Sequence, residues 1–239
     1  MVADPEEVSE AFASHFARVS SKNPSLPYYR ERIQEENKIL DFTATRAESY
    51  NVPFSMKEFL SALSTCNDSA PGVDNITYSM IKLLPQNTQE FMLTIMNKIW
   101  IENLFPSVWD IAIMLAFLKP QKDGTNVSNY RPIALTSCIC KLMEKMINVR
   151  LVWFLEKKGL INPSQCGFRR MRSCTDVLIR LEASICEAFA SKKHLISVFF
   201  DLEKAYDTAW RFGILRILHE IGLRGELPLF IKSFLSNKV

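Results

Sequence analysis

The sequence has little glycine, with seven residues in 239, and only eleven prolines. With 48% hydrophobic residues as well, it does not have the composition of a low-complexity or disordered chain. Long hydrophobic runs are also missing. The longest, Ile111–Leu118 and Leu195–Phe200, are far too short to cross a bilayer, so we expect a chain that buries a core and does not enter a membrane. The acidic start, Met1 to Glu7, has no basic region and so does not look like a signal peptide.

The cysteines form no Cys-x-x-Cys pair, and the three histidines are not spaced beside them as zinc ligands. The six cysteines are at positions 66, 138, 140, 166, 174 and 186. We therefore expect free thiols in a reducing compartment, that is, an intracellular protein of the cytoplasm, the nucleus or both.

Charge is distributed unevenly along the chain. Residues 1–118 carry 9 Lys and Arg against 15 Asp and Glu, a net charge of −6, whereas residues 119–239 carry 20 against 11, a net of +9. Such a basic half favours a polyanionic partner. An ordinary solvated basic face explains the charge equally well, so the motifs have to decide between the two.

Hydrophobic periodicity predicts an α+β fold in which helices pack on a small, mostly antiparallel sheet. Residues 1–51 are polar and predict a peripheral arm or linker with a helix near Val8–Val19. The other helices are expected at residues 56–63, 78–84, 88–103, 141–158, 175–191, 208–221 and 227–236, and the strands at 111–118, 133–136 and 196–200. The inward faces are expected to be Met56, Phe59, Leu60 and Leu63 in the first of these helices, and Phe91, Ile95, Met96 and Ile99 in the third.

The apolar run Ile196–Phe200 ends in a carboxylate at Asp201. A buried strand would present this carboxylate at its end, where it could hold a divalent metal against a triphosphate. Taken alone, Asp201 is more often a capping acid at a strand–helix junction. A phosphatase of the haloacid-dehalogenase type also starts from a strand-end aspartate, but it needs a second aspartate where this chain has Glu203.

The pattern Asp-x-x-Lys-Ala-Tyr-Asp-x-x-Trp over residues 201–210 resembles the first palm motif of reverse transcriptases. More narrowly, it is similar to the non-LTR (LINE-type, jockey-like) retrotransposon group. The resemblance implies that Asp201 is catalytic and binds metal, with the carbonyl of Leu202 as a second ligand, and that two Mg²⁺ ions act in the intact enzyme. It also implies that Tyr206 lies under the sugar of the incoming nucleotide. Asp207 is expected to be structural.

Two basic segments, Lys119-Pro-Gln-Lys122-Asp and Tyr130-Arg131-Pro-Ile-Ala-Leu, flank one polar loop. If the apolar stretches beside them pair as strands, the loop projects as a flexible basic finger. A basic hairpin loop on its own is more often simply solvated. Together and in this order, the segments resemble the first fingers motifs of the same family. That resemblance implies that Lys119 or Lys122, together with Arg131, holds the phosphates of the nucleotide.

A third motif, Gln165-Cys-Gly-Phe-Arg-Arg-Met-Arg-Ser-Cys, resembles the family pattern Gln-x-Gly-Phe-Arg-x-x-Arg-Ser-Thr. The chain departs from the pattern at Met171, where glycine is usual, and at Cys174, where threonine is usual. The alternative is a basic loop with a helix cap at Ser173 or Thr175. The resemblance implies that the template is contacted by Gln165, Gly167, Phe168, Arg169 and Arg172.

The segment Ala70-Pro-Gly-Val-Asp-Asn-Ile resembles the upstream segment of the family, with Asn75 where glycine is usual, and Pro106-x-x-Trp109 resembles its linker. The resemblance thus covers residues 52–239 and leaves residues 1–51 as the arm. It implies the fingers and first half of the palm of a right-hand polymerase, with an RNA template, a DNA primer and deoxynucleoside triphosphates as partners.

The second acidic motif of the family contains Asp-Asp, and these 239 residues contain no Asp-Asp pair. We therefore expect a reverse transcriptase segment that is inactive alone, lacking that motif and the thumb. The alternative is a non-catalytic nucleic-acid-binding remnant of such an element. The sequence gives no indication of the oligomeric state.

Overall fold

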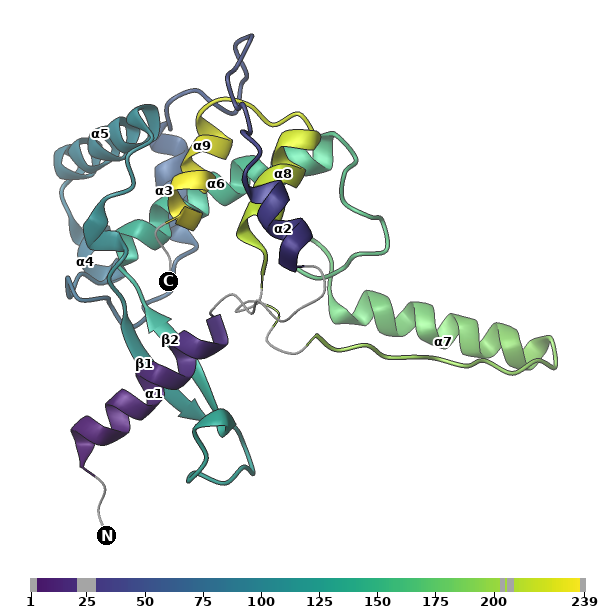
Figure 1. Ribbon diagram of the computed structural model, residues 1–239. Coiled ribbons are helices and arrows are strands. Elements are labelled where there is room, and N and C mark those ends of the chain that lie inside the picture. The colour runs from purple at the N-terminus through teal and green to yellow at the C-terminus, as the bar shows by residue number, and fades with distance from the viewer. Residues whose placement is uncertain (1–3, 21–28, 203–204, 206–208, 237–239) are drawn as a thin grey trace. The chain divides into compact units, whose positions relative to one another are not determined.

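The computed structural model describes residues 4–20, 29–202, 205 and 209–236 (Figure 1). The elements, with η for 3₁₀ helices, are α1 (Pro5–Ser20), α2 (Tyr29–Glu36), α3 (Met56–Ser64), α4 (Tyr78–Leu83), α5 (Gln86–Glu102), η1 (Ser107–Trp109), β1 (Ile113–Leu118), η2 (Val127–Asn129), β2 (Tyr130–Leu135), α6 (Cys138–Lys157), α7 (Cys174–Ala190), α8 (Arg211–Glu220) and α9 (Glu226–Ser236). The expectation of a helical protein with a small antiparallel sheet is confirmed.

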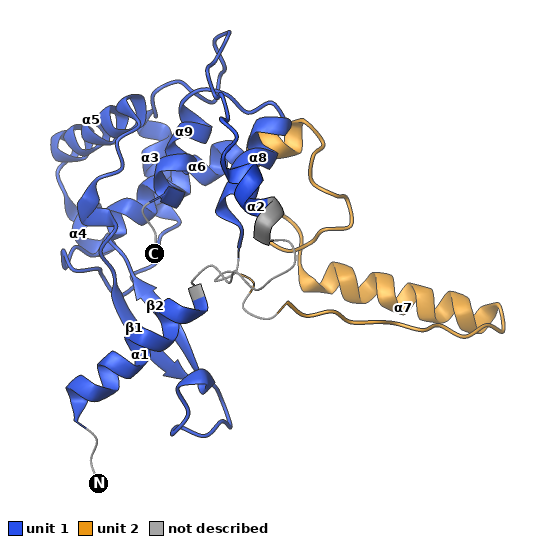
Figure 2. Ribbon diagram, in the orientation of Figure 1, with its two compact units in different colours: residues 1–151, 206–239 blue, residues 152–205 orange. Residues whose placement is uncertain are grey.

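Two compact units divide the chain (Figure 2). Residues 1–151 and 206–239 form unit 1, and residues 152–205 form unit 2. Helix α6 begins in unit 1, and its last turn lies in unit 2.

Helix α6 supplies much of the buried surface of unit 1. As its apolar periodicity predicts, Leu142, Met143, Met146 and Ile147 are buried. The helix ends at Lys157, and Gly159 follows with a φ of +63°, the left-handed conformation of a residue just past a helix. The prediction for this helix is confirmed apart from its start, which comes three residues earlier, at Cys138.

A second part of this core lies around Trp100 of α5. The Trp100 ring lies 4.9 Å from that of Phe54 and 6.1 Å from that of Phe230 in α9, measured between centroids. Its indole N–H donates to the carbonyl of Asn51 at 3.1 Å. A long-range set of aromatic contacts thus ties α5 to α9 and to the segment before α3.

The inward face predicted for α5 is wrong in part. Phe91 is 66% exposed and Ile95 is 46% exposed, while Leu93, Met96 and Trp100 are buried. Both faces of this helix are apolar, so hydrophobicity alone did not identify the buried one. Helix α3 shows a smaller error of the same kind: Phe59, Ala62 and Leu63 are its buried residues, and Leu60 is 46% exposed.

The sheet of the described residues is the antiparallel pair β1–β2, with Ile113 opposite Leu135 and Leu118 opposite Tyr130. Phe117 lies opposite Arg131 in this register. Because side chains alternate along a strand, Arg131 and Tyr130 point to opposite faces of the hairpin. The face that carries Tyr130 also receives α1, since the Phe12 ring meets the Tyr130 ring edge-on at 4.7 Å (Figure 1).

Gly72, in the upstream motif, packs directly against the backbone that joins β2 to α6. A Cβ atom at this position would lie 2.7 Å from the backbone nitrogen of Ser137 and 2.8 Å from the carbonyl carbon of Thr136. Only glycine lets the two segments approach so closely. The motif therefore fixes the base of the hairpin.

Unit 2 buries far less of its apolar surface. Helix α7 has no buried residue, although it opens with a capping box between Ser173 and Asp176. After α7 the chain turns back at Ser191–Lys193 and runs extended (Figure 1). The strand predicted at Ile196–Phe200 is wrong: residues 193–202 carry no regular secondary structure. A strand needs a neighbour for its backbone hydrogen bonds, and no described strand pairs with this run.

All six cysteines are free thiols: Cys174 and Cys186 on α7 are exposed, and the other four are buried. Among the described residues, no helix combines the length and the apolar character needed to span a bilayer.

Candidate nucleic-acid interface

The β1–β2 hairpin carries three of the predicted phosphate ligands, all within unit 1. Arg131 is exposed on β2, and Lys122 is exposed in the turn that follows β1. Lys119 is half-buried, and its ammonium donates to the carbonyl of Ser128 at 2.9 Å. An ammonium has three N–H donors, so this bond anchors the loop and still leaves donors for a phosphate.

Hydrogen bonds within the loop between the strands close it. Asp123 accepts from the backbone N–H of Thr125 at 3.0 Å and from its hydroxyl at 2.5 Å. Asn126 accepts from the N–H of Ser128 at 2.9 Å and caps η2. The Tyr130 hydroxyl donates to the carbonyl of Gly124 at 3.0 Å. Short polar side chains thus close this loop with their own hydrogen bonds, and its flexibility stays a prediction.

Asp123 places one negative charge among these cations. The hydrogen bonds from the Thr125 hydroxyl and then from its backbone N–H lower the pKa of Asp123. The carboxylate is therefore charged at neutral pH and partly offsets Lys119 and Lys122. The loop attracts phosphate only moderately as a result.

In unit 2, Arg169 forms a fork with Glu156 near the end of α6. Its Nε and Nη2 donate to the two carboxylate oxygens at 2.8 and 2.7 Å. Its Nη1 also donates to the carbonyls of Asn162 and Gln165, at 3.1 and 3.2 Å. The hydrogen bond from Arg169 lowers the pKa of Glu156. In this structure Arg169 fastens the loop to α6, a role for which the motif gave no signal.

The rest of this loop is exposed. Phe168 and Met171 are each 91% exposed, and Arg172 is also exposed. Gln165 donates to the carbonyl of Gly167 at 3.4 Å, and a Cβ atom at Gly167 would meet nothing within 4 Å. The loop therefore presents a ring, a guanidinium and open backbone, which are the groups that stack on bases and contact phosphates.

Backbone geometry explains where this chain departs from the family pattern. Met171 has a φ of +61° and Asn75 a φ of +56°, and both stand where the pattern has glycine. Glycine takes this left-handed conformation without strain, asparagine tolerates it, and methionine rarely adopts it. The usual glycines are therefore explained by backbone conformation.

Asp201 and Leu202, the predicted metal ligands, are exposed in the extended segment of unit 2. Carboxylate and carbonyl oxygens are donors that suit Mg²⁺. No group of three or more Asp, Glu, His or Cys side chains gathers as a metal site among the described residues. These two residues thus fit part of a coordination shell. Tyr206, the predicted nucleotide contact, lies outside the described residues.

Trp210 closes the motif that starts at Asp201, and the N-terminal arm holds it. Its indole N–H donates to Glu36 at 3.0 Å, and the guanidinium carbons of Arg32 and Arg216 each lie 5.2 Å from its ring centre. Arg216 also pairs with Glu35 at 3.3 Å. Arg32, Glu35 and Glu36 stand three and four residues apart in α2, a spacing that predicts pairing within the helix and gives no signal for the contact with Trp210.

Comparison with known proteins adds a family to this geometry. Residues 119–239 match the family described as reverse transcriptase (RNA-dependent DNA polymerase). The probable RNA-directed DNA polymerase from transposon X-element of Drosophila melanogaster is 30% identical over 238 residues, which cover 96% of this chain and 25% of that protein.

Two further Drosophila melanogaster proteins are similar. The RNA-directed DNA polymerase from mobile element jockey is 31% identical over 169 residues, covering 71% of this chain and 18% of that protein. The probable RNA-directed DNA polymerase from transposon BS is 31% identical over 164 residues, covering 68% and 18%. The chain thus spans a quarter or less of the length of these curated relatives.

Proposed function

The chain belongs to the reverse transcriptase (RNA-dependent DNA polymerase) family, and on that basis we propose that it supplies the nucleotide- and template-contacting part of a non-LTR retrotransposon polymerase. Residues 52–239 would be the fingers and first half of the palm, and residues 1–51 an arm. The observation that supports this most is the β1–β2 hairpin, which presents Lys122 from its hydrogen-bonded loop and Arg131 from β2.

Transfer of a nucleotide gathers negative charge on the phosphate oxygens, so cations fixed before the reaction lower its barrier. We assign this work to Arg131, whose planar fork suits a phosphate, and to Lys122 and Lys119 as point charges. The template would contact Phe168 and Arg172 in the loop of unit 2, together with Gln165, Gly167 and Arg169.

Asp201 and the carbonyl of Leu202 would hold Mg²⁺, two ions of it in the whole enzyme. When bound, the metal would activate the 3′-hydroxyl of a DNA primer and steady the departing pyrophosphate. Tyr206 would exclude a 2′-hydroxyl and so favour deoxynucleoside triphosphates. The six free thiols also support a reducing, intracellular setting.

The test is binding of a labelled single-stranded RNA to the 239-residue chain over a series of salt concentrations. Each lost phosphate contact reduces the slope of log affinity against log salt by about 0.7. We expect the double variant Lys122→Ala/Arg131→Ala to bind more weakly, with a slope reduced by roughly 1.4. The control Arg46→Ala/Lys57→Ala removes the same charge from exposed sites of unit 1 away from the hairpin. Equal affinities and slopes for the two variants would refute the assignment.

The alternative is a module that binds nucleic acid without catalysis. An assay of primer extension separates it from a polymerase. We expect these 239 residues alone to bind RNA without extending a primer, because two-metal catalysis needs further carboxylates beside Asp201. Template-dependent incorporation of a labelled deoxynucleotide, abolished by Asp201→Asn, would contradict this expectation.

A further inference from the structure

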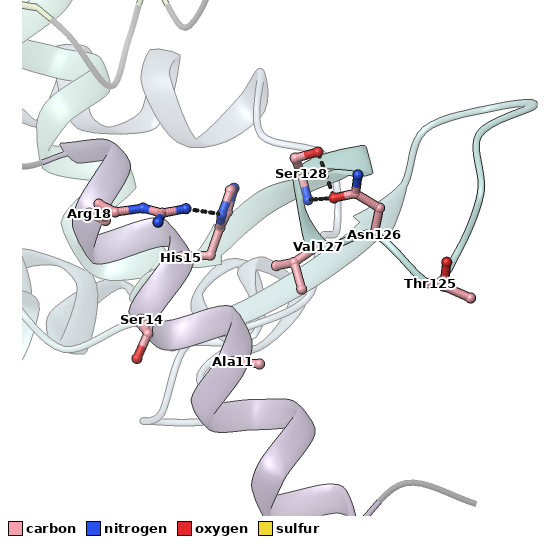
Figure 3. A pocket seen from close by; sticks show the side chains of 8 residues that line it. All are labelled: Ala11, Ser14, His15, Arg18, Thr125, Asn126, Val127 and Ser128. Atoms are coloured by element: carbon pink, nitrogen blue, oxygen red, sulfur yellow. Dashed lines mark hydrogen bonds between the residues drawn. The ribbon is translucent and has the colours of Figure 1, made fainter. Parts of the chain in front are cut away.

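A polar hollow lies where α1 meets the loop of the β1–β2 hairpin, and it has a volume of about 620 Å³. Figure 3 shows α1 on one side and the η2 loop on the other. The residues that line it are Ala11, Ser14, His15, Arg18, Thr125, Asn126, Val127 and Ser128. Its volume falls in the range of sites that accept a ligand the size of a nucleotide, roughly 300–1,000 Å³.

The hollow is rich in hydrogen-bond donors. Arg18 Nη2 lies 3.5 Å from His15 Nδ1. When Nδ1 accepts this bond, the proton of a neutral His15 sits on Nε2, which then becomes a donor too. The Arg18 guanidinium has several more N–H groups, whereas the Ser128 hydroxyl donates to Asn126 at 2.7 Å and so serves the loop. A guanidinium and an imidazole N–H are groups that recognise a phosphate.

The walls of the hollow are held in place. The edge-on contact between the Phe12 and Tyr130 rings, at 4.7 Å, fixes α1 against the hairpin. On the loop side, the Ser128 carbonyl accepts from Lys119, and its N–H is bonded to Asn126. The hollow is therefore continuous with the loop that carries Lys119 and Lys122.

Two carboxylates lie near the hollow and oppose an anion. Glu10 accepts from the Ser14 hydroxyl at 3.4 Å, and Asp123 is bonded to Thr125. They weaken the attraction and make a strongly bound free anion an unfavourable occupant. A phosphate that is one of several along a strand gains from the neighbouring lysines as well.

We propose that this hollow binds a backbone phosphate of single-stranded nucleic acid, so that α1 extends the contact surface of the hairpin by one further nucleotide. The proposal rests on the proposed function, because the strand would be the one that the hairpin engages. It assigns Arg18 and His15 as ligands in a helix that the sequence marked only as a peripheral arm.

The test compares His15→Gln/Arg18→Gln with the control Arg46→Gln in the full 239-residue chain. Arg46 is exposed in unit 1 and is not part of the hollow. Labelled RNA and single-stranded DNA of the same length and sequence are the probes, and fluorescence anisotropy gives the affinities. We expect the double variant to bind about tenfold more weakly, as loss of a charged hydrogen bond predicts. Its salt slope should fall by about 0.7, as for one phosphate.

The outcomes separate the two proposals. If the parent binds RNA and His15→Gln/Arg18→Gln matches Arg46→Gln in affinity and slope, the hollow is refuted and the proposed function stands. If the parent binds neither probe, both fail. An equal loss of affinity for RNA and for DNA in the double variant supports a backbone phosphate as the ligand. If poly-glutamate displaces RNA from the parent and not from the double variant, the proposal is overturned in favour of an acidic peptide.

Discussion

The two units of the molecule each contain an arginine–glutamate fork, and the surroundings of the two forks differ. In unit 1, Arg150 of α6 donates to the two oxygens of Glu58 at 2.8 and 3.0 Å, and the two side chains are 8% and 34% exposed. In unit 2, Arg169 donates to Glu156 at nearly the same distances, with the two side chains 12% and 39% exposed.

What the forks connect is different. Arg150 reaches across 92 residues, donates also to the carbonyls of Tyr50, Val52 and Pro53, and lies 3.9 Å over the Phe54 ring. Arg169 reaches across 13 residues, from its loop to the end of α6. Unit 1 is therefore joined by long-range contacts around a core, whereas unit 2 is joined locally.

The apolar residues follow the same division. Unit 1 buries Trp100 and Phe59 completely, whereas Phe199 and Phe200 in unit 2 are 82% and 91% exposed. Similar side chains thus stabilise one unit and contribute little to the other. The difference is whether a second element packs against them.

The largest effect should appear in amide hydrogen exchange. Amides of residues 142–147 lie in the buried part of α6, so we expect them to exchange on the order of a thousandfold slower than free peptide, or more. Amides of residues 196–202 have no secondary structure and should exchange near the free rate. Mass spectrometry of peptic peptides measures both. Strong protection at residues 196–202 would remove the contrast between the units.

The next largest effect should be the change in stability when the arginine of each fork is replaced. Arg150→Met leaves Glu58 and three carbonyls without their cation, so we expect unfolding to become easier by about 3–5 kcal/mol. Arg169→Met breaks a local pair that joins one loop to the end of α6, and it should cost about 0–1 kcal/mol. Chemical denaturation of both variants gives the two values.

Lysine variants provide the matched control. Arg150→Lys keeps the charge but cannot fork, so it should recover only part of the loss, whereas Arg169→Lys should resemble the parent. Equal costs for Arg150→Met and Arg169→Met would show that the long-range fork does not distinguish the units.

Much of the fold could be predicted from the sequence wherever the pattern is local. The helices expected at residues 56–63 and 141–158 and the apolar runs beside the hairpin loop each depend on neighbouring residues, and these elements formed within a few residues of their expected bounds. The buried face of α5 could not be predicted, because it depends on where Phe54 and Phe230 pack. A strand at residues 196–200 depends on a partner strand, which periodicity does not reveal.

For the candidate site, the motifs identified residue types but not their contacts. They gave no indication that Arg169 would bind Glu156 or that α1 would reach the hairpin loop, because both contacts arise from tertiary packing.

Glycine substitutions sharpen the comparison at a smaller scale. Gly72→Ala places a methyl group against the Ser137 backbone, and we expect a loss of about 1–3 kcal/mol of stability. Gly167→Ala, in the open loop of unit 2, should be neutral or stabilising by about 0.4–1 kcal/mol. Thermal unfolding of the two variants, each against the parent, tests this. A harmless Gly72→Ala would mean that the hairpin base can shift.

Acid should affect the long-range fork. Burial raises the pKa of Glu58, but hydrogen bonds from Arg150 and from Ser55 outweigh it, and the net pKa is lowered. The stability from this carboxylate is therefore present above its unfolded pKa, about 4.3, and is lost as pH falls through the lower folded value. Between pH 6 and pH 3, the free energy of unfolding should fall less for Glu58→Gln than for the parent. An equal fall in the two proteins would show that the charge of Glu58 does not stabilise the fold.

The smallest effect concerns Met171 and Asn75, two of the left-handed residues. Met171→Gly should relieve strain and change stability by no more than about 1 kcal/mol, because the greater freedom of glycine in the unfolded chain opposes the gain. Asn75→Gly should change less, since asparagine already tolerates this conformation. Melting temperatures that fall equally for both would contradict the strain argument.

The reactivity of the native thiols can report on the state of the two units. Cys174 and Cys186 are exposed on α7, while the four other thiols are buried. Their separation along the helix, twelve residues, corresponds to about 18 Å. A maleimide dye would therefore mark α7 in the native sequence without any engineered cysteine. Anything that covers α7 would slow labelling at one or both positions. Unfolding of unit 1 would be recorded when Cys66, Cys138 and Cys140 start to react.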